Sequence, residues 1–562
     1  MPVKPKSRIN DFPDLIKISG RLKKPSGFFV QGLNYYHFGG MLNNCNKNKK
    51  FGGIFFMNSI GFDSEKYLAE QSAAILERAG KFGDKLYIEF GGKLICDFHA
   101  ARVLPGFDPD AKIKLLQRLK DKVDIVICIH AGAIEEKKVR ADFGLSYDAD
   151  TMRTIDDLRD WGLDVTAVVV TRYTDQPSVK GFINRLSRRG IRVYTHRPIE
   201  GYPTDLDTIV SERGYGANEY IETSRPIVVV TGPGPNSGKM ATCLSQVYHE
   251  YQRGIKAGYA KFETFPVWNL TLDHPVNVAY EAATADLGDV NMVDPFHLKA
   301  RGETAVNYNR DVDVFPVVKR ICARIMPPEQ LYVSPTDMGV NRVGFAITDN
   351  DVVSEASRQE IIRRYFRALC DYAVGREEKC VSERVKLLMD DLNISVLDRT
   401  VVTPARKAAE DAASLPEKHG SENVFCGAAI QLHDGTIITG KNSPLLHAAS
   451  SCIINAIKHL AGLPGDLHLV SPQIIESVGN LKHDVFKEKQ ISLALSETLT
   501  ALSVSTPSNP AAALAMKQLK HLAGCEMHLS HIPTPGDEAA LRKIGVNLTS
   551  EPVFASRNIF ME

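Results

Sequence analysis

The chain has 562 residues, which is too long for one hydrophobic core, and its length predicts about three domains. Its 44% hydrophobic and 24% charged residues are ordinary for a soluble globular protein. The 68 Lys and Arg residues nearly cancel the 67 Asp and Glu residues, so no overall charge favours nucleic acid or an anionic membrane as a partner.

The cysteines and the apolar segments point to a cytoplasmic protein. None of the ten cysteines has the two-residue spacing of a zinc knuckle or redox pair, so we expect no disulfides and a reducing compartment. Cys96, Cys128 and Cys243 lie inside apolar runs and are expected in the core. No apolar stretch approaches the roughly 20 residues that cross a bilayer, and the N-terminus lacks the apolar core of a signal peptide.

Residues 1–56 differ from the rest of the chain. The stretch "NNCNKNKKFGG" is polar and rich in turn residues, and nothing before it has a sustained helical or strand period. A helical pattern begins after Met57, in "GFDSEKYLAEQSAAILERAGKFG". We therefore interpret residues 1–56 as a weakly ordered extension or the product of an upstream start codon. A transit peptide is a further alternative, although Asp11 and Asp14 are unusual in one.

After Met57, short β-branched runs alternate with amphipathic segments. The expected helices include 110–121 and 180–190, and the expected strands are 85–90, 123–130, 164–171, 191–196 and 225–231. Strands that are apolar on both faces and separated by helices predict parallel βαβ units. The predicted fold class is therefore α/β and multidomain, with parallel sheets of Rossmann-like or P-loop-like type.

Three folded domains are expected after the extension. The first covers 57–222, and the second covers 223–413, a P-loop-like α/β domain whose charged helical connector begins at Ser354. The segment "SLPEKHGSEN" (414–423) resembles a linker in composition, and a C-terminal α/β domain follows over 414–562.

The stretch "VVVTGPGPNSGKMATCLSQ" (228–246) has the order that a phosphate cradle needs: a strand, a glycine-rich turn and a helix. Glycines let backbone N–H groups approach phosphates, the helix N-terminus adds partial positive charge, and a lysine neutralises the outer phosphates. The residues predicted to bind a nucleotide are Thr231, Gly232, Gly234, Asn236, Ser237, Gly238, Lys239 and Thr242. The alternative is a glycine turn with a solvated lysine.

This loop departs from the common P-loop in two ways. The spacing from Gly232 to Gly238 is one residue longer, and Met240 replaces the Ser or Thr whose hydroxyl binds magnesium. The longer spacing resembles the loop of the dethiobiotin synthetase group, in which a second strand carries a lysine; here Lys261 stands at the matching point. ATP and Mg²⁺ are the expected cofactors, and Thr231, Ser237 or Thr242 could supply the hydroxyl.

Polar residues gather in "TADLGDVNMVDPFHL" (284–298) and "AVNYNRDVDVFP" (305–316). Carboxylates after strands commonly hold magnesium or act as general bases, and an arginine can stabilise a transferring phosphoryl group. An ordinary turn has the same composition. The candidate catalytic residues are Lys261, Asp286, Asp294, His297 and Arg310.

Two further loops are weaker candidates for ligand contacts. The segment "SPTDMGVNRVG" (334–344) combines Thr336, Asp337, Asn341 and Arg342 with glycines, and an ordinary surface turn is an equal alternative. In "IEFGGKLICDFHAARVLPGFDP" (88–109), the residues Glu89, Gly91, Gly92 and Lys93 could form a second anion-binding turn, with His99 and Arg102 nearby.

The stretch "CGAAIQLHDGTIITGKNSPLLHAASSCIINAIKHLAGLP" (426–464) resembles the opening of a cytidine-deaminase-like domain. His447 and Ala448 match its metal-binding His-Ala-Glu, but Ala449 replaces the glutamate. Pro510 is followed by alanine where the first zinc-binding thiolate would stand. We therefore expect a non-catalytic domain without zinc, which packs against the other domains or forms the interface of a homo-oligomer.

Several strings together, among them "HAARVLPGFDPDAKIKLL", "TGPGPNSGKMATCLSQVYHEY" and "GYAKFETFPVWNL", resemble the domain of unknown function 1846 family, which is mostly bacterial. The resemblance runs from about Met57 to the C-terminus and implies a multidomain α/β cytosolic protein with no established activity. Some relatives carry a peptidase or zinc-protease label, which this chain does not support because it lacks an H-E-x-x-H pair.

Three functions follow from these motifs. The first is an ATP-dependent cytosolic enzyme that phosphorylates or ligates a small metabolite. The second is a protein that binds a nucleotide or phosphorylated metabolite without turnover, which the loss of the hydroxyl at Met240 favours. The third is a lyase or isomerase that grips the phosphate of its substrate with the loop.

Overall fold

The computed structural model describes residues 59–140, 145–414, 424–488 and 490–556. All of them fall in one compact unit, Phe55–Glu562. The expected extension and the expected linker over 415–423 lie outside the described residues. Among the residues that are described, no helix is long and apolar enough to cross a membrane.

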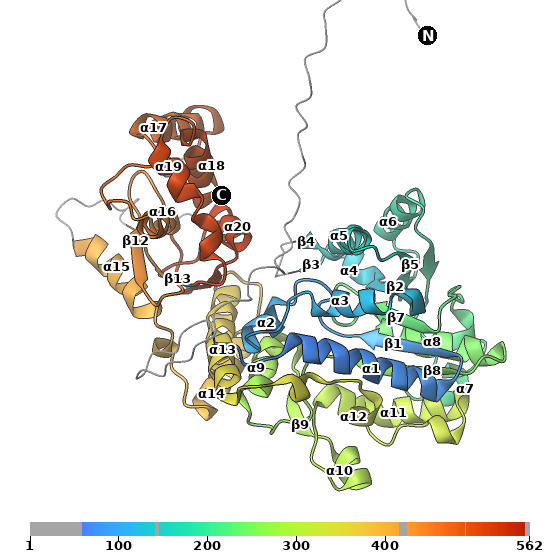
Figure 1. Ribbon diagram of the computed structural model, residues 1–562. Helices are drawn as coiled ribbons and strands as arrows, with labels where there is room; N and C mark the ends of the chain where they lie inside the picture. Colours follow the sequence, from blue (N-terminus) through green and yellow to red (C-terminus); the bar gives the residue numbers. More distant parts are fainter. Residues whose placement is uncertain (1–58, 141–144, 415–423, 489, 557–562) are drawn as a thin grey trace, which may run out of the picture. The chain divides into compact units, whose positions relative to one another are not determined.

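A six-stranded parallel sheet forms the centre of the larger half of the protein (Figure 1). Its strands are β1 (Lys85–Phe90), β2 (Val123–His130), β5 (Val165–Thr171), β6 (Val193–Thr195), β7 (Ile227–Thr231) and β8 (Ala257–Phe262). Their order is β6-β5-β2-β7-β1-β8. The strands predicted from the apolar runs and the α/β fold class are both confirmed. Strands β1, β7 and β8 are buried at every position, which agrees with the apolar faces from which they were predicted.

The strand order can be compared with the domain boundary that the sequence predicts between residues 222 and 223. The strands β7 and β8 follow that boundary in the sequence, yet β7 lies between β1 and β2, and β8 pairs with β1. The boundary therefore does not separate two sheets. Residues on both of its sides build the same hydrophobic core.

Helices pack on this sheet. Those before β7 are α1 (Ser64–Phe82), α2 (Phe98–Val103), α3 (Ala111–Arg118), α4 (Ala131–Glu135), α5 (Tyr147–Asp160), α6 (Pro177–Ser187) and α7 (Leu206–Ile209), with a short hairpin of β3 (Val139–Arg140) and β4 (Leu145–Ser146). After β7 comes α8 (Lys239–Gln252), which packs on β1, β7 and β8. Helix α1 packs on β1 and α3, and it begins where Asp63 caps the backbone N–H of Lys66 at 2.9 Å.

The segment after β8 is mainly helical. It contains α9 (Pro275–Ala283), α10 (Pro295–Arg301), α11 (Asn309–Ile325), α12 (Pro335–Met338), α13 (Asn350–Ala373), α14 (Lys379–Asp391) and α15 (Val402–Ser414), with an antiparallel pair of β9 (Asn291–Val293) and β10 (Val306–Tyr308). The expected helical connector after Ser354 is part of this set.

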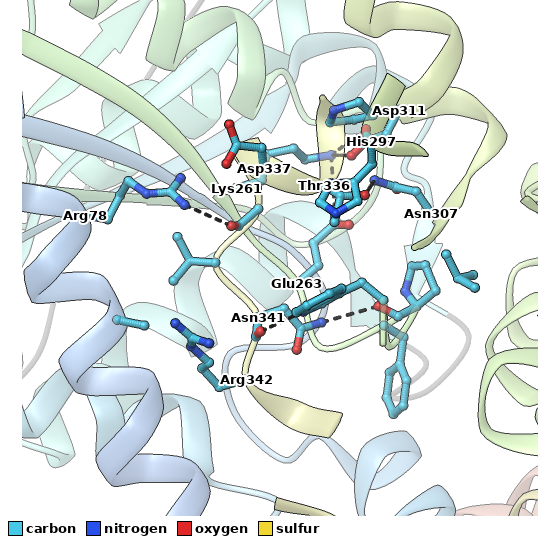
Figure 2. Close-up of a pocket in the computed structure, with 18 of the residues that line it drawn as sticks. Arg78, Lys261, Glu263, His297, Asn307, Asp311, Thr336, Asp337, Asn341 and Arg342 are labelled. Carbon is cyan, nitrogen blue, oxygen red and sulfur yellow. Dashed lines mark hydrogen bonds and ion pairs between the residues drawn. The ribbon is translucent and has the colours of Figure 1, made fainter. Parts of the chain in front are cut away.

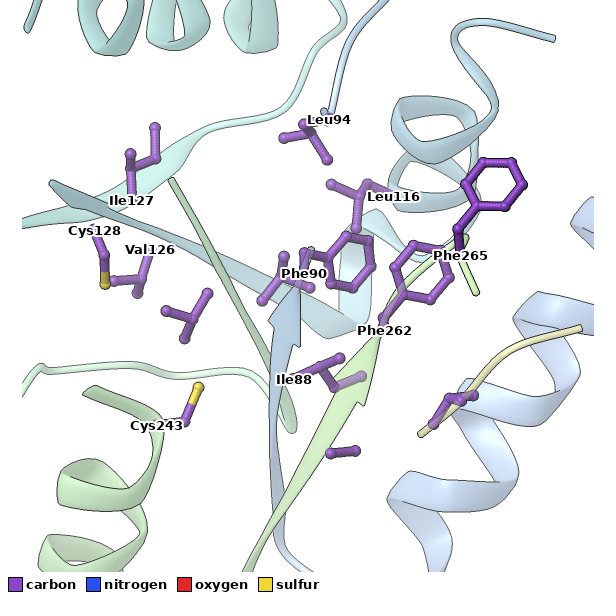
Figure 3. Packing of buried hydrophobic residues seen from close by; sticks show 14 of the residues in the cluster. Ile88, Phe90, Leu94, Leu116, Val126, Ile127, Cys128, Cys243, Phe262 and Phe265 are labelled. Carbon is purple, nitrogen blue, oxygen red and sulfur yellow. The ribbon is translucent and has the colours of Figure 1, made fainter. Parts of the chain in front are cut away.

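The core under the carboxyl edge of the sheet is aromatic and tightly packed (Figure 3). Phe90 and Phe262 stack with 4.3 Å between their ring centroids, and burial of each phenyl ring contributes about 2–3 kcal/mol. Cys128 and Cys243 are buried here, as predicted. The prediction was wrong for Cys96, which is half-exposed because it sits in a turn with a φ of 54°.

The C-terminal half has its own sheet and core. Strands β11 (Gly427–Gln431), β12 (Ile437–Lys441), β13 (Glu526–Leu529) and β14 (Asn547–Ser550) have the order β12-β11-β13-β14. The helices are α16 (Ala448–Leu460), α17 (Pro472–Asn480), α18 (Leu495–Ser505), α19 (Pro510–Met516) and α20 (Pro535–Ile544). The predicted strand-turn-strand-helix pattern is confirmed by β11, β12 and α16, while the deaminase resemblance stays a prediction.

Candidate functional site

The sheet changes direction between β1 and β7. The chain leaves β1 for β2 by crossing β7, and it leaves β7 for β8 by crossing β1 in the opposite sense. Because parallel crossovers are right-handed, the two connecting segments leave to opposite faces of the sheet. Such a switch point opens a crevice at the carboxyl edge, where open α/β sheets bind their ligands. The turn Gly91–Lys93 and the glycine-rich loop meet at this crevice.

The glycine-rich loop has the strand–loop–helix order that the sequence predicts. Strand β7 ends at Thr231 and α8 begins at Lys239. Gly238 has a φ of 88°, and a Cβ there would lie 2.7 Å from Thr171 Oγ1. The Thr171 hydroxyl in turn donates a hydrogen bond to the Ser237 carbonyl at 2.8 Å. The loop therefore needs glycine at this position on two grounds.

The hydroxyl of Ser237 occupies the inside of the loop. It donates to the Gly234 carbonyl at 3.0 Å, and it lies 2.5 Å from the place where a Cβ on Gly232 would stand. Only 2% of Ser237 is exposed. A phosphate in this loop must displace that hydroxyl, and breaking a neutral hydrogen bond costs about 1 kcal/mol.

The ammonium group of Lys239 forms an ion pair with a carboxylate. Its Nζ lies 3.8 Å from Glu89 Oε1, and both side chains are 11% exposed. Glu89 also accepts a hydrogen bond from the Tyr259 hydroxyl at 2.9 Å. The charge of Lys239 is therefore balanced, and a bound phosphate would compete with Glu89 for it.

Three hydroxyl groups could replace the magnesium-binding hydroxyl that is missing at Met240, and they lie in different surroundings. Thr242 Oγ1 lies within hydrogen-bond distance of Cys128 Sγ and His196 Nδ1, in the protein interior. Thr231 is 3% exposed and is the last residue of β7. Thr231 also lines the crevice, and the Ser237 hydroxyl lies inside the loop.

The crevice itself is small. It has a volume of about 30 Å³, room for about one water molecule, and it is lined by Gly92, Lys93, Thr231, Gly232 and Arg153 among others. Its lining contains two cationic side chains, Lys93 and Arg153, but also the carboxylates of Asp150 and Asp157, and Arg153 lies 3.4 Å from Asp157 Oδ2. The charges around the crevice are therefore balanced, as is that of Lys239. A nucleotide needs more room, so its binding requires the loop to move.

A larger cavity lies on the other side of the turn (Figure 2). Its volume is about 300 Å³, at the lower end of the range for small-molecule sites. Its walls come from α1, the end of β8, α10, β10, α11 and the segment 335–342. The predicted ligand loop is brought here, because Thr336, Asp337, Asn341 and Arg342 all line the cavity.

Lys261 lies in this cavity within a network of oxygen acceptors. Its Nζ is 2.6 and 2.7 Å from the two carboxylate oxygens of Asp311, 2.8 Å from the Tyr308 hydroxyl and 3.3 Å from Glu263 Oε1. Burial by itself lowers the pKa of Lys261, but the carboxylates of Asp311, Glu263 and Glu89 outweigh it and hold the pKa above its ordinary value. Lys261 is therefore a charged anchor that orients Asp311 and Glu263.

Glu263 is the residue of this network best suited to move a proton. It accepts a hydrogen bond from the Tyr308 hydroxyl at 3.1 Å, and its side chain is 25% exposed. Burial raises the pKa of Glu263, Lys261 opposes this, and the charges of Asp311 and Glu89 raise it further. A carboxyl group whose pKa is raised toward neutrality suits general acid–base catalysis.

His297 is the second predicted catalytic residue that lines the cavity. Its Nδ1 lies 3.2 Å from Ser334 Oγ, and only 6% of the residue is exposed. Its Nε2 has no hydrogen-bond partner within the part of the chain that the structure describes. A buried ring nitrogen without a partner is costly, and a ligand in the cavity can supply that partner.

The other predicted catalytic residues lie elsewhere. Asp294 is fully buried and caps α10 by accepting from the backbone N–H groups of Phe296 and His297, and it also accepts from the Thr336 hydroxyl. Arg310 binds the Asp289 carboxylate with two hydrogen bonds of 2.5 and 2.8 Å. Asp294 and Arg310 therefore have structural partners, and neither they nor the exposed Asp286 are among the residues that line the cavity.

Two weaker candidates also have structural partners. His99 and Arg102 both contact the buried carboxylate of Glu360, at 3.0 and 2.7 Å, instead of reaching the turn after β1. In the C-terminal sheet region, His447 Nδ1 lies 2.7 Å from Asp537 Oδ2.

The chain resembles known proteins over nearly all of its described length. The family described as "Domain of unknown function DUF1846, N-terminal" matches residues 60–393, and "Domain of unknown function DUF1846, C-terminal" matches residues 397–560. A UPF0371 protein of Clostridium botulinum (strain Alaska E43 / Type E3) is 57% identical over 502 residues, which are 89% of this chain and 99% of the relative. Another, from Clostridioides difficile (strain 630), is 54% identical over 501 residues, with the same coverage of both chains. This chain therefore belongs to the DUF1846 family, whose bacterial relatives are the UPF0371 proteins.

Proposed function

We propose that the protein is an ATP-dependent enzyme that acts on a small metabolite. The metabolite occupies the cavity of about 300 Å³, and the phosphates of ATP bind at the switch-point crevice. One observation carries the proposal: both spaces border the turn after β1. Gly92 and Lys93 line the crevice, whereas Glu263, which lines the cavity, packs so closely on Gly91 that a Cβ there would lie 2.6 Å from its Cγ.

The residues around the turn divide the chemistry between them. Lys239 and the backbone N–H groups of the loop would hold the outer phosphates, and Ser237, whose hydroxyl now donates to the Gly234 carbonyl, would supply the hydroxyl that holds magnesium. Magnesium, when bound, neutralises charge on the transferring phosphoryl group. Glu263 accepts the proton of the metabolite's attacking oxygen as that oxygen bonds to the γ-phosphorus of ATP, the bond from that phosphorus to the bridging oxygen breaks, and ADP leaves. Lys261 fixes Glu263 in place and, with its full charge, offsets the two carboxylates that flank it.

The charges of the two spaces are connected through Glu89. It pairs with Lys239 on the crevice side, and it lies opposite Lys261 in the register of β1 and β8. When a phosphate draws Lys239 away, Glu89 loses its ion pair and becomes a stronger counter-charge for Lys261. The same step raises the proton affinity of Glu263, because Glu89 is one of the charges that raise its pKa. Nucleotide binding would thereby prepare the base.

The test combines a thermal melt with a phosphate-release assay on the purified full chain, with ATP and magnesium present. We expect ATP to raise the melting temperature and Lys239→Ala to abolish that shift. Lys256→Ala is the matched control, because this exposed lysine precedes β8 at the opposite edge of the sheet. Phosphate release that occurs only when a pool of metabolites is added supports the proposed enzymatic activity. A melting temperature that no nucleotide changes would refute the proposal.

A second candidate function is binding without turnover. Two observations favour it: Met240 replaces the magnesium-binding hydroxyl, and the Ser237 hydroxyl fills the loop. A thermal shift with ATP but no phosphate release under any condition selects this alternative. A shift with sugar phosphates and none with ATP selects a phosphometabolite lyase or isomerase that uses Glu263 and His297 alone.

A further inference from the structure

We propose that the cavity holds its small molecule by an oxyanion, a carboxylate or a phosphate, bound between Arg78 and Arg342. The inference rests on the proposed function only in placing the metabolite in this cavity. Figure 2 shows both arginines on the side of the cavity away from His297 and Asp311. Arg78 comes from α1 and Arg342 from the segment after α12.

The other basic side chains of the cavity already have carboxylate partners. Lys261 pairs with Asp311 at 2.6 Å, Arg301 with Asp337 at 3.0 Å, and Lys81 with Glu77 at 3.1 Å. Among the described residues, Arg78 and Arg342 form no ion pair, although both are partly buried and line the same space. The exposed carboxylate of Glu77 interacts with the charges of both guanidinium groups, but it is paired with Lys81, so this side of the cavity keeps a net positive charge that attracts an anion.

Both guanidinium groups are held in place while donors remain available. Arg78 donates to the Tyr332 hydroxyl and to the carbonyls of Met338 and Gly339, at 3.2, 3.2 and 3.3 Å. A guanidinium has five N–H donors, so two remain. The guanidinium of Arg342 lies 5.3 Å from the centroid of the Phe345 ring, and its backbone N–H donates to Gln71. A stacked, planar fork of this kind binds a carboxylate or phosphate with two hydrogen bonds.

The opposite side of the cavity repels an anion and thereby orients the ligand. The Lys261 network contains one cation and two carboxylates, those of Asp311 and Glu263. An oxyanion at the arginines therefore directs the rest of the molecule toward Glu263 and the unpartnered Nε2 of His297. The predicted substrate class is a small acid with a hydroxyl, amine or second acid group at its other end.

The experiment titrates the full chain with succinate, with its neutral analogue succinamide, and with inorganic phosphate, by calorimetry. Succinate or phosphate is expected to bind, and the stronger of the two identifies the oxyanion; succinamide is not expected to bind. Arg342→Gln should weaken that binding about tenfold or more, and Arg78→Lys, which keeps the charge but loses the fork, should weaken it less. The control is Lys256→Gln, which removes an exposed cation outside the cavity and should bind as the wild type does.

The outcomes separate this inference from the proposed function. Lys239→Ala removes binding at the glycine-rich loop, so oxyanion binding that persists in this variant belongs to the cavity. Equal binding by wild type and Arg342→Gln, equal binding of succinamide, or no binding of either oxyanion overturns the inference even if ATP still shifts the melt. Oxyanion binding that depends on Arg342, without any response to ATP, leaves the inference standing and removes the proposed function.

Discussion

Replacement of Lys261 by methionine tests the electrostatic reasoning about the cavity. Methionine keeps an unbranched apolar stem of similar length, so the change removes charge and hydrogen bonds with little loss of packing. It leaves Asp311, which is 8% exposed and has Lys261 as its ion-pair partner, beside a second carboxylate on Glu263. Breaking a buried ion pair by removing one partner costs about 3–5 kcal/mol.

The cost has an upper limit that follows from protonation. Asp311 can take up a proton, and protonating an ordinary aspartate at pH 7 costs about 4 kcal/mol. We therefore expect Lys261→Met to lower the free energy of unfolding by about 4 kcal/mol. At about 2 °C per kcal/mol for a large unit, the melting midpoint falls by roughly 8 °C. The double variant Lys261→Met/Asp311→Asn should recover most of this loss, because it removes the uncompensated charge.

Differential scanning calorimetry at pH 7 measures both variants, with Lys256→Met as the exposed control. A midpoint for Lys261→Met within about 2 °C of wild type would mean that the network does not hold a buried charge. A double variant that is no more stable than the single one would show that packing, not charge, explains the loss. Either result would refute the reasoning.

Three further variants test other parts of the account. Because the folded-state pKa of Glu263 is raised, the stability it contributes is full below the unfolded pKa and is lost as the pH rises through the folded pKa. Glu263→Gln should therefore gain stability relative to wild type as the pH rises above about 4 in thermal melts. Gly238→Ala, with a φ of 88° and a Cβ 2.7 Å from Thr171 Oγ1, should cost about 1–3 kcal/mol in denaturant unfolding and abolish the ATP shift. Arg399→Met removes a guanidinium that is 1% exposed and binds Glu526, and should cost about 3–5 kcal/mol by calorimetry.

Matched controls accompany these variants. Gly254→Ala has a similar φ of 75° but open space around it, so it should cost less than Gly238→Ala and keep the ATP response. A constant difference between Glu263→Gln and wild type across the pH range would contradict the raised pKa. An Arg399→Met protein as stable as wild type would mean that the Glu526 carboxylate gains enough from its remaining 2.9 Å contact with Arg363.

The strands and the glycine-rich loop were predictable because their signals are local. Runs such as 123–130 are apolar on both faces, and the order of strand, glycines and lysine around Gly238 is contiguous in the sequence. The strand order was not predictable. Strand β7 lies between β1 and β2, and no local sequence pattern indicates which strands are neighbours in the sheet. The meeting of Gly92 with Gly232 at the crevice depends on it.

The cavity depended even more on tertiary structure. Asp311 follows Lys261 by 50 residues and reaches it only because α11 begins beside the end of β8. Glu263 was missed, although its position directly after β8 at the carboxyl edge was a usable signal. Asp294 was misleading, since an aspartate followed by Pro295 is also the signature of a helix N-cap, which is the role it has.

The most direct test of the central claim is a crystal structure of the full chain grown with a non-hydrolysable ATP analogue and magnesium. The account predicts phosphate density between Gly92 and the loop 232–239, with the Ser237 hydroxyl turned away from the Gly234 carbonyl and Lys239 drawn from Glu89. A loop that keeps the Ser237 hydrogen bond, with the analogue absent or seated only in the cavity beside Glu263, would contradict it.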